Sequence, residues 1–248
     1  MLFRSLTNGA LAGAECVLGY TPLHYAVVFG LTSVAELLLT NGASAGTADK
    51  RGDTPLHYVA KNNHTGMAGL LLTNGASVGA ATECGDTPLH LAAKNNHTGM
   101  AELLLTNGAS VGATTKWGET PLHLAAKNNH TGVAELLLTN GASVGAVTDS
   151  GSTPLHYAAF HGHTGMAELL LANGALLGVA SALGFTPLHY AAVHGRNTDM
   201  MGLFMANSAL YGDEVGVGVG EGRERRQSRM KYLIRKLRRR VCHILGRR

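Results

Sequence analysis

Apolar residues recur along most of the chain at the three-four spacing of amphipathic helices, in short segments separated by turns. One stretch in the middle of the chain represents the others. The apolar face of its first predicted helix consists of Leu89, Ala92 and Ala93. The apolar face of its second predicted helix consists of Met100, Leu103 and Leu104. The pattern predicts pairs of short helices.

The ends of these helices carry recognisable signals. A residue before proline is pushed toward extended geometry, so Thr87 is suited to cap the first helix. Pro88 then occupies the first turn, where no amide donor is needed. The second helix is predicted to end at Asn107 and Gly108, because glycine tolerates the left-handed conformation at a helix stop.

The turn between the two helices has a restricted composition. In successive copies it holds only glycine or asparagine: Gly30, Asn63, Asn96, Asn129, Gly162 and Gly195. These two residues accept positive φ most readily. The sequence therefore predicts a left-handed residue at this position in each copy.

The helix pairs belong to an internal repeat. The tetrapeptide TPLH begins at residues 21, 54, 87, 120, 153 and 186, so that every interval is 33 residues. The segment LTNGALAGA from Leu6 matches LTNGASVGA from Leu72, which predicts that the N-terminus is the back half of a seventh unit. One helix pair cannot bury its apolar face alone, and stacking on its neighbours spreads stability along the array.

On these residues the chain resembles the ankyrin repeat family: TPLHYA or TPLHLAA, the NGA turn and the 33-residue period, over roughly residues 1 to 211. The resemblance implies an all-α solenoid of helix–turn–helix units with hairpin-like loops. It also implies binding to other proteins rather than catalysis. We expect a repeat array over 1–211, a glycine-rich linker over 212–222 and a basic amphipathic tail over 223–248.

Histidines are the main candidates for chemistry. One set fills the last position of TPLH: His24, His57, His90, His123, His156 and His189. At N3 of a helix the side chain reaches back to the threonine cap, whereas a helical metal site would need a second histidine at i+4. A second set follows the turn between the helices: His64, His97, His130 and His163. Because Leu31 takes the same place in the first copy, we predict packing or capping for this set too.

No catalytic, cofactor or metal site is predicted. His161 and His163 form a local HGH without a cysteine or carboxylate at ligand spacing, and HExxH and GxxxxGK motifs are absent from the sequence. The string GVGVGEG follows no predicted strand and is interpreted as linker. We therefore expect neither an enzyme nor a small-molecule substrate.

Composition and charge bound the setting of the protein. Aromatic residues make up only 5% of the 248 residues and glycine is frequent at 33, which is typical of many short helices and turns. Cys16, Cys84 and Cys242 form no CxxC pair, which favours a reducing compartment. No apolar stretch reaches the length of a membrane span. We predict a cytoplasmic protein, with the nucleus and a membrane surface as alternatives that the tail raises.

The predicted partner-binding residues lie where the copies differ. The two variable zones are the loop before TPLH and the residue pair before the Gly/Asn turn, which the family resemblance equates with hairpin tips and a concave helical face. Trp117, the only tryptophan, is a predicted interface anchor at a tip. Neutral drift is the alternative, and apolar tips near each end are alternatively predicted to cover the terminal units. The candidates are Phe29, Lys50, Arg51, Asp53, Lys61, Asn62, Lys94, Asn95, Lys116, Trp117, Glu119, Lys127, Asn128, Phe160, His161 and Phe185.

The C-terminal tail differs in charge from the rest. Residues 221–248 carry a net charge of +10, whereas the first 220 residues carry −6. Met230, Leu233, Ile234 and Leu237 follow helical spacing, which predicts a basic amphipathic helix. Its candidate targets are an anionic membrane, a nucleic acid or nuclear import receptor, and an acidic surface such as calmodulin or the repeats themselves; a solvated tail is the remaining alternative. Its basic residues include Arg229, Lys231, Arg235, Lys236, Arg238, Arg239 and Arg240.

The predicted function is that of a non-catalytic scaffold or adaptor, which binds a partner protein through loop tips and the concave helical face. The alternative is a membrane-peripheral or nucleic-acid-associated protein whose basic C-terminal helix supplies the main affinity.

Overall fold

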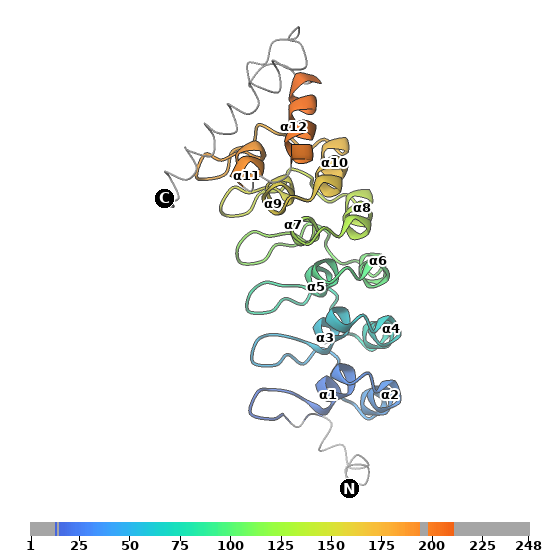
Figure 1. The fold of residues 1–248 in the computed structure, drawn as a ribbon. Helices are drawn as coiled ribbons and strands as arrows, with labels where there is room; N and C mark the ends of the chain where they lie inside the picture. The colour runs from blue at the N-terminus through green and yellow to red at the C-terminus, as the bar shows by residue number, and fades with distance from the viewer. Residues whose placement is uncertain (1–12, 14, 194–197, 211–248) are drawn as a thin grey trace. The chain divides into compact units, whose positions relative to one another are not determined.

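The computed structural model describes residue 13, residues 15–193 and residues 198–210, and the helices within these residues come in pairs (Figure 1). The first helices of the pairs are α1 (Pro22–Val28), α3 (Pro55–Asn62), α5 (Pro88–Lys94), α7 (Pro121–Lys127), α9 (Pro154–His161) and α11 (Pro187–Val193). The second helices are α2 (Thr32–Thr40), α4 (Thr65–Thr73), α6 (Thr98–Thr106), α8 (Thr131–Thr139), α10 (Thr164–Ala172) and α12 (Thr198–Leu210). The described residues contain no strand, which confirms the predicted all-α helix–turn–helix architecture.

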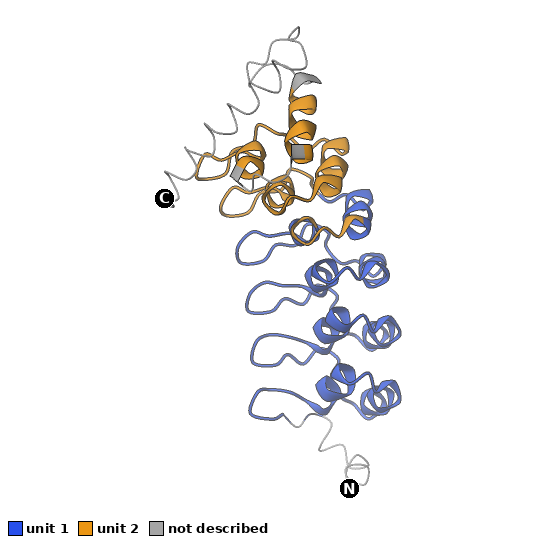
Figure 2. Ribbon diagram, viewed as in Figure 1, with its two compact units in different colours: residues 1–125, 132–142 blue, residues 126–131, 143–248 orange. Residues whose placement is uncertain are grey.

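The chain forms two compact units (Figure 2). Unit 1 comprises residues 1–125 and 132–142, and unit 2 comprises residues 126–131 and 143–248. In unit 1, α1 packs against α3, α3 against α5, and α4 against α6. In unit 2, α9 packs against α11 and α10 against α12. Successive helix pairs therefore stack within each unit.

Loops connect the pairs. In unit 1 each loop projects beside the first helices, on the side opposite the second helices (Figure 1). The predicted hairpin-like loops are confirmed in this arrangement. A loop of this kind leaves its tip, and the neighbouring face of the first helix, outside the packed core.

The predicted helix start is confirmed. Thr54 has extended geometry, with φ −90° and ψ 166°, and Pro55 begins α3. Thr87 repeats this at φ −97° and ψ 166° before α5. Proline therefore occupies the one turn of the helix in which its missing N–H costs nothing.

The turn between the two helices of a pair is restricted to glycine and asparagine for the predicted reason, a positive φ. Asn63, Asn96 and Asn129 lie at φ 60°, 61° and 60°, in the left-handed region. Gly30 and Gly162 take the same place at φ 68° and 75°. The sixth member, Gly195, lies outside the described residues.

Leucine, alanine and methionine supply most of the core. Leu89 and Leu104 are fully buried, as are Ala92 and Met100. Leu103, predicted on the same face, is only half-buried because it lies at the edge of the apolar stripe. Burial of one such leucine stabilises the fold by roughly 1.5–3 kcal/mol. Small neighbouring residues such as alanine let the helices pack closely enough to bury it.

Three predicted segments lie mainly outside the described residues. They are the partial N-terminal unit, the glycine-rich linker over 212–222 and the basic tail over 223–248.

Candidate interaction surface

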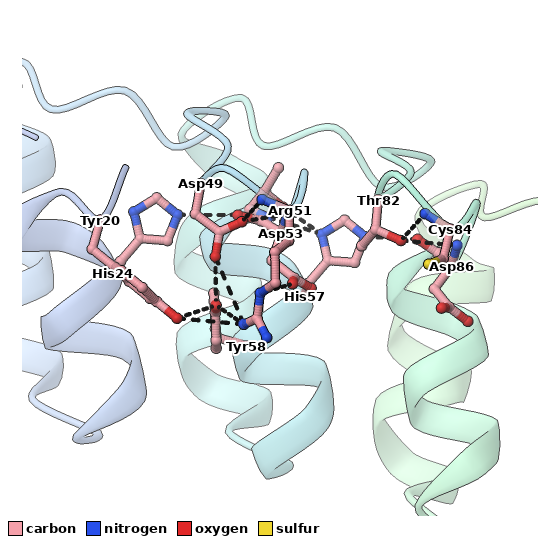
Figure 3. Close-up of polar contacts among 11 residues, drawn as sticks. Tyr20, His24, Asp49, Arg51, Asp53, His57, Tyr58, Thr82, Cys84 and Asp86 are labelled. Atoms are coloured by element: carbon pink, nitrogen blue, oxygen red, sulfur yellow. Dashed lines mark hydrogen bonds and ion pairs between the residues drawn. The ribbon is translucent and has the colours of Figure 1, made fainter. Parts of the chain in front are cut away.

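The histidine of TPLH joins two consecutive repeats, as His57 illustrates (Figure 3). Its Nδ1 accepts a hydrogen bond from the Thr54 N–H at 3.1 Å and lies 2.9 Å from the Thr54 hydroxyl. Its Nε2 lies 3.0 Å from the backbone carbonyl of Asp86, in the next repeat. Because a carbonyl only accepts, Nε2 carries the proton and the imidazole is the neutral tautomer.

The same bridge recurs in both units. In unit 1, Nε2 of His24 donates to the Asp53 carbonyl at 3.2 Å, and that of His90 donates to the Glu119 carbonyl at 3.0 Å. In unit 2, His156 Nε2 lies 3.0 Å from a carbonyl 29 residues further along the chain. Sequence reasoning found the cap and missed the bridge. The signal was the second ring nitrogen, which a glutamate or glutamine in a capping box does not have.

Burial keeps these histidines neutral. It lowers the pKa of His24, His57, His90 and His156 below the ordinary value, although hydrogen bonds to carbonyls oppose the shift. With both nitrogens engaged, the predicted structural role of this set is confirmed. Among the described residues, no cluster of three or more metal-ligating side chains is present.

The second histidine set ties each repeat to the one before it. His64 Nδ1 lies 3.2 Å from the Val27 carbonyl, at the end of α1. His97 Nδ1 lies 3.0 Å from the Ala60 carbonyl, in the last turn of α3. In unit 2, His163 Nε2 lies 3.1 Å from a carbonyl at the end of the preceding first helix. The predicted packing or capping role is confirmed for these residues.

Backbone hydrogen bonds link neighbouring hairpin tips. A Cβ on Gly52, which lies at φ 80°, would come 2.9 Å from the Glu83 nitrogen, so the tips meet where only glycine fits. In each case a backbone N–H at one tip donates a hydrogen bond to a backbone carbonyl of the preceding tip, with N···O distances of 2.8–3.1 Å. The donor–acceptor pairs are Lys50 with Leu18, Glu83 with Arg51, Lys116 with Cys84 and, in unit 2, Ala182 with Ser150.

A polar cluster stiffens the hairpin before α3 (Figure 3). Asp49 Oδ1 accepts hydrogen bonds from the backbone N–H groups of Arg51 at 2.8 Å and Asp53 at 3.0 Å. The Tyr58 hydroxyl donates to Asp49 Oδ2 at 2.7 Å and lies 2.8 Å from the Tyr20 hydroxyl. The guanidinium of Arg51 donates to Tyr58 at 2.9 Å. These contacts fix the tip of the hairpin.

The cluster also balances its own charge. Burial alone would raise the pKa of Asp49, but hydrogen bonds from Tyr58 and two backbone N–H groups outweigh it and lower the pKa. Arg51 lies 3.9 Å from the Asp49 carboxylate and 3.5 Å from the Asp53 carboxylate. Its side chain is still 67% exposed. Arg51 therefore presents a fixed group whose charge is partly neutralised.

A groove of about 340 Å³ opens beside this cluster, between the second and third repeats. Its walls are the hairpins that precede α3 and α5 and the faces of these two helices that lie next to the hairpins, which we call the inner helical face. The structure brings five predicted binding residues together here, from both variable zones. The lining residues are Arg51, Asp53, His57, Tyr58, Lys61, Thr82, Cys84, Asp86, Leu91, Lys94 and Asn95.

Most of the other predicted binding residues are exposed, and Glu119 is half-buried. Trp117 is 50% exposed, with Lys116 Nζ 5.0 Å from its ring centroid. In unit 2, Phe160 is partly exposed and packs edge-on against His161. The remaining exposed members are Phe29, Lys50, Asn62, Lys127 and Asn128.

Phe185 requires a correction. It was predicted as a surface residue, yet it is only 5% exposed. Its ring lies 5.9 Å from that of His189 and 6.0 Å from that of Tyr190. An aromatic side chain gains more from this burial than from exposure to water. The alternative prediction, that apolar tips near the ends cover their own units, describes Phe185 better.

The basic tail lies outside the described residues, and with it all seven predicted contacts from Arg229 to Arg240. The described helices include none with the length and apolar character needed to cross a bilayer.

Comparisons with known proteins agree with this geometry. No curated protein matches the chain. The family model for ankyrin repeats, which spans three copies, matches residues 2–82, 23–115, 74–148, 99–180 and 144–212. The overlapping matches cover nearly all of the repeats and reach into the N-terminal segment predicted as a seventh unit. The chain belongs to the ankyrin repeat family.

Proposed function

We propose that this protein is a non-catalytic adaptor that holds a partner protein against the hairpin tips and the inner helical face of unit 1. Ankyrin repeats are generally protein–protein interaction modules. The observation that carries the proposal is the groove between the second and third repeats, whose charged rim is not used to build the core.

The contrast between fixed backbone and variable side chains supports this role. At one hairpin position, 33 residues apart, the repeats carry Arg51, Cys84 and Trp117. The backbone bonds between neighbouring tips fix the positions from which these side chains project before a partner arrives. A preorganised surface loses little conformational entropy on binding, so chemically different side chains on it provide affinity and specificity.

Site-specific photo-crosslinking tests the proposal. A photoreactive amino acid at Asn95, in the groove, is expected to capture a distinct protein from cell extract, and excess unlabelled protein should compete for it. The matched control places the same amino acid at Glu102, an exposed residue of α6 on the opposite side of the repeat. Equal labelling from Asn95 and Glu102 would contradict binding through the groove.

A second arm addresses the tail. The substitutions Arg238→Gln, Arg239→Gln and Arg240→Gln in the full chain remove three charges and leave the repeats unchanged. We expect capture at Asn95 to persist. Loss of capture would favour the alternative, in which the tail supplies the main affinity.

A further inference from the structure

We propose that the groove of unit 1 binds an extended partner segment in which an acidic residue recurs every third position, with a basic residue in each interval. This inference rests on the proposed function and specifies the chemistry of the partner. It follows from three features of the described groove: a pair of equivalent lysines, a carboxylate facing them, and the spacing of neighbouring repeats.

The lysines form the basic side of the groove. Lys61 and Lys94 occupy the same position in α3 and α5, and both are exposed. Within the described part of unit 1, neither ammonium makes a salt bridge; the ion pairs there belong to Arg51. Two cations on adjacent helices therefore face solvent along one side of the groove, where a partner's carboxylates can form charge-assisted hydrogen bonds with both.

The opposite side of the groove is acidic. Asp86 directly precedes the Thr87 cap of α5, whereas Lys94 ends that helix. From Pro88 to Lys94 the helix rises about 9 Å at 1.5 Å per residue, so Asp86 and Lys94 lie at opposite ends of α5. The Asp53 carboxylate on the same side is already engaged with Arg51, which leaves Asp86 to receive a basic residue. The groove thus offers two cations on one side and the Asp86 carboxylate on the other.

The spacing of the repeats selects the conformation of the ligand. Helices that pack directly, as α3 and α5 do, lie about 8–10 Å apart. A polyproline II segment has three residues per turn and advances about 3.1 Å per residue, so every third side chain lies on one face about 9 Å further along. Acidic residues three apart therefore reach Lys61 and Lys94 together. A basic residue between them points away from the lysines and toward Asp86.

Two synthetic peptides of identical composition test this register. The first, (Glu-Lys-Pro)4, has the proposed period, and its prolines favour the extended conformation. The second, (Glu-Glu-Lys-Lys-Pro-Pro)2, has the same length and zero net charge but breaks the period. Fluorescence anisotropy with the labelled peptides and the full-length protein at low salt is expected to show at least about tenfold tighter binding of the first.

Matched charge reversals locate the binding site. Lys61→Glu combined with Lys94→Glu is expected to weaken binding of the first peptide by about tenfold or more. Glu36→Lys combined with Glu102→Lys reverses two charges at exposed positions of α2 and α6, outside the groove, and should alter binding by less than about twofold. All four side chains are exposed, so both variants should fold, which circular dichroism checks. Asp86→Asn should weaken binding by about threefold.

The outcomes separate the two proposals. Equal binding of both peptides, no binding of either, or unchanged binding by the Lys61/Lys94 variant overturns the inference about the ligand. If a protein is still captured at Asn95 in any of these cases, the groove remains the binding surface and only the proposed chemistry is wrong. Without capture at Asn95, the proposed function fails as well.

Discussion

Two hairpins of the protein share a backbone and differ in their side chains. In unit 1, residues 49–53 close with a hydrogen bond from the first N–H to the last carbonyl at 2.9 Å, and residues 181–185 of unit 2 close in the same way at 2.9 Å. The fourth residue is Gly52 in one and Gly184 in the other, at φ 80° and 75°. The last carbonyl of each accepts a hydrogen bond from a TPLH histidine of the preceding repeat.

The side chains stabilise the two hairpins by different means. Asp49 uses both carboxylate oxygens to bind backbone N–H groups and Tyr58. At the same position, the Ser181 hydroxyl is buried and makes no hydrogen bond to any described residue. The last residue is half-buried Asp53 in unit 1 and buried Phe185 in unit 2. Since the histidine bridge and the glycine hold the backbone, a hairpin is free to become a polar surface or part of the core.

The largest effect is expected at Phe185. Phe185→Ala removes a buried ring and its contacts with two aromatic neighbours, which should cost about 3 kcal/mol in the free energy of unfolding. The comparison variant in the polar hairpin, Arg51→Ala, should cost about 1 kcal/mol or less, because that side chain is mostly exposed. Urea denaturation followed by circular dichroism measures both. Similar losses for the two variants would remove the distinction between the hairpins.

Acid should weaken both units through the feature that they share. Burial lowers the pKa of His24, His57, His90 and His156 in the folded state. Below the ordinary histidine pKa of about 6.5, the unfolded chain therefore binds more protons than the folded chain, and stability falls as pH decreases. Thermal melts between pH 7.5 and 5 should show a decreasing midpoint, and a midpoint that stays constant would argue against buried neutral histidines.

The sequence was sufficient for the architecture because its signals are local. The threonine cap, the proline after it and the Gly/Asn turn act within a few residues of each other, so a single repeat reveals them. The bridge from His57 to the Asp86 carbonyl spans 29 residues. Its geometry depends on how two repeats stack, which local spacing does not specify. The core face containing Leu89 and Met100 was predictable for the same reason as the caps.

The candidate site was predictable only in outline. Comparison of the repeats identified Lys61 and Lys94 as variable positions, and both line the groove. Comparison of the repeats could not show that Phe185 is buried and Trp117 exposed, because both are aromatic residues in hairpins. One is buried by neighbouring rings and the other lies under a lysine at the surface. Only tertiary packing decides between these outcomes.

A smaller effect is expected inside the polar hairpin. Tyr58→Phe removes the hydroxyl that donates to Asp49 and leaves one oxygen of a buried carboxylate without that donor, at a cost of about 1–2 kcal/mol. Tyr25→Phe is the matched control in the preceding repeat, where the hydroxyl donates to the Cys16 sulfur over 3.8 Å at the surface. Its cost should stay below about 0.5 kcal/mol. Equal costs, measured by chemical denaturation, would show that the cluster adds nothing to stability.

The smallest effect should be a gain, at Ser181, whose Oγ is the one buried side-chain polar atom of the described residues without a hydrogen-bond partner. Thr115, at the same position in unit 1, accepts backbone N–H groups at 3.2 and 3.3 Å through its Oγ1. Threonine has a stiffer χ1 than serine, so Ser181→Thr should favour this capping rotamer and raise the free energy of unfolding by about 0.5 kcal/mol. Ser181→Ala separates the two contributions, because it removes the unpaired hydroxyl without adding a cap. If threonine destabilises the protein while alanine does not, Phe185 and its neighbours pack too tightly for another methyl group, and the difference between the hairpins originates in the core.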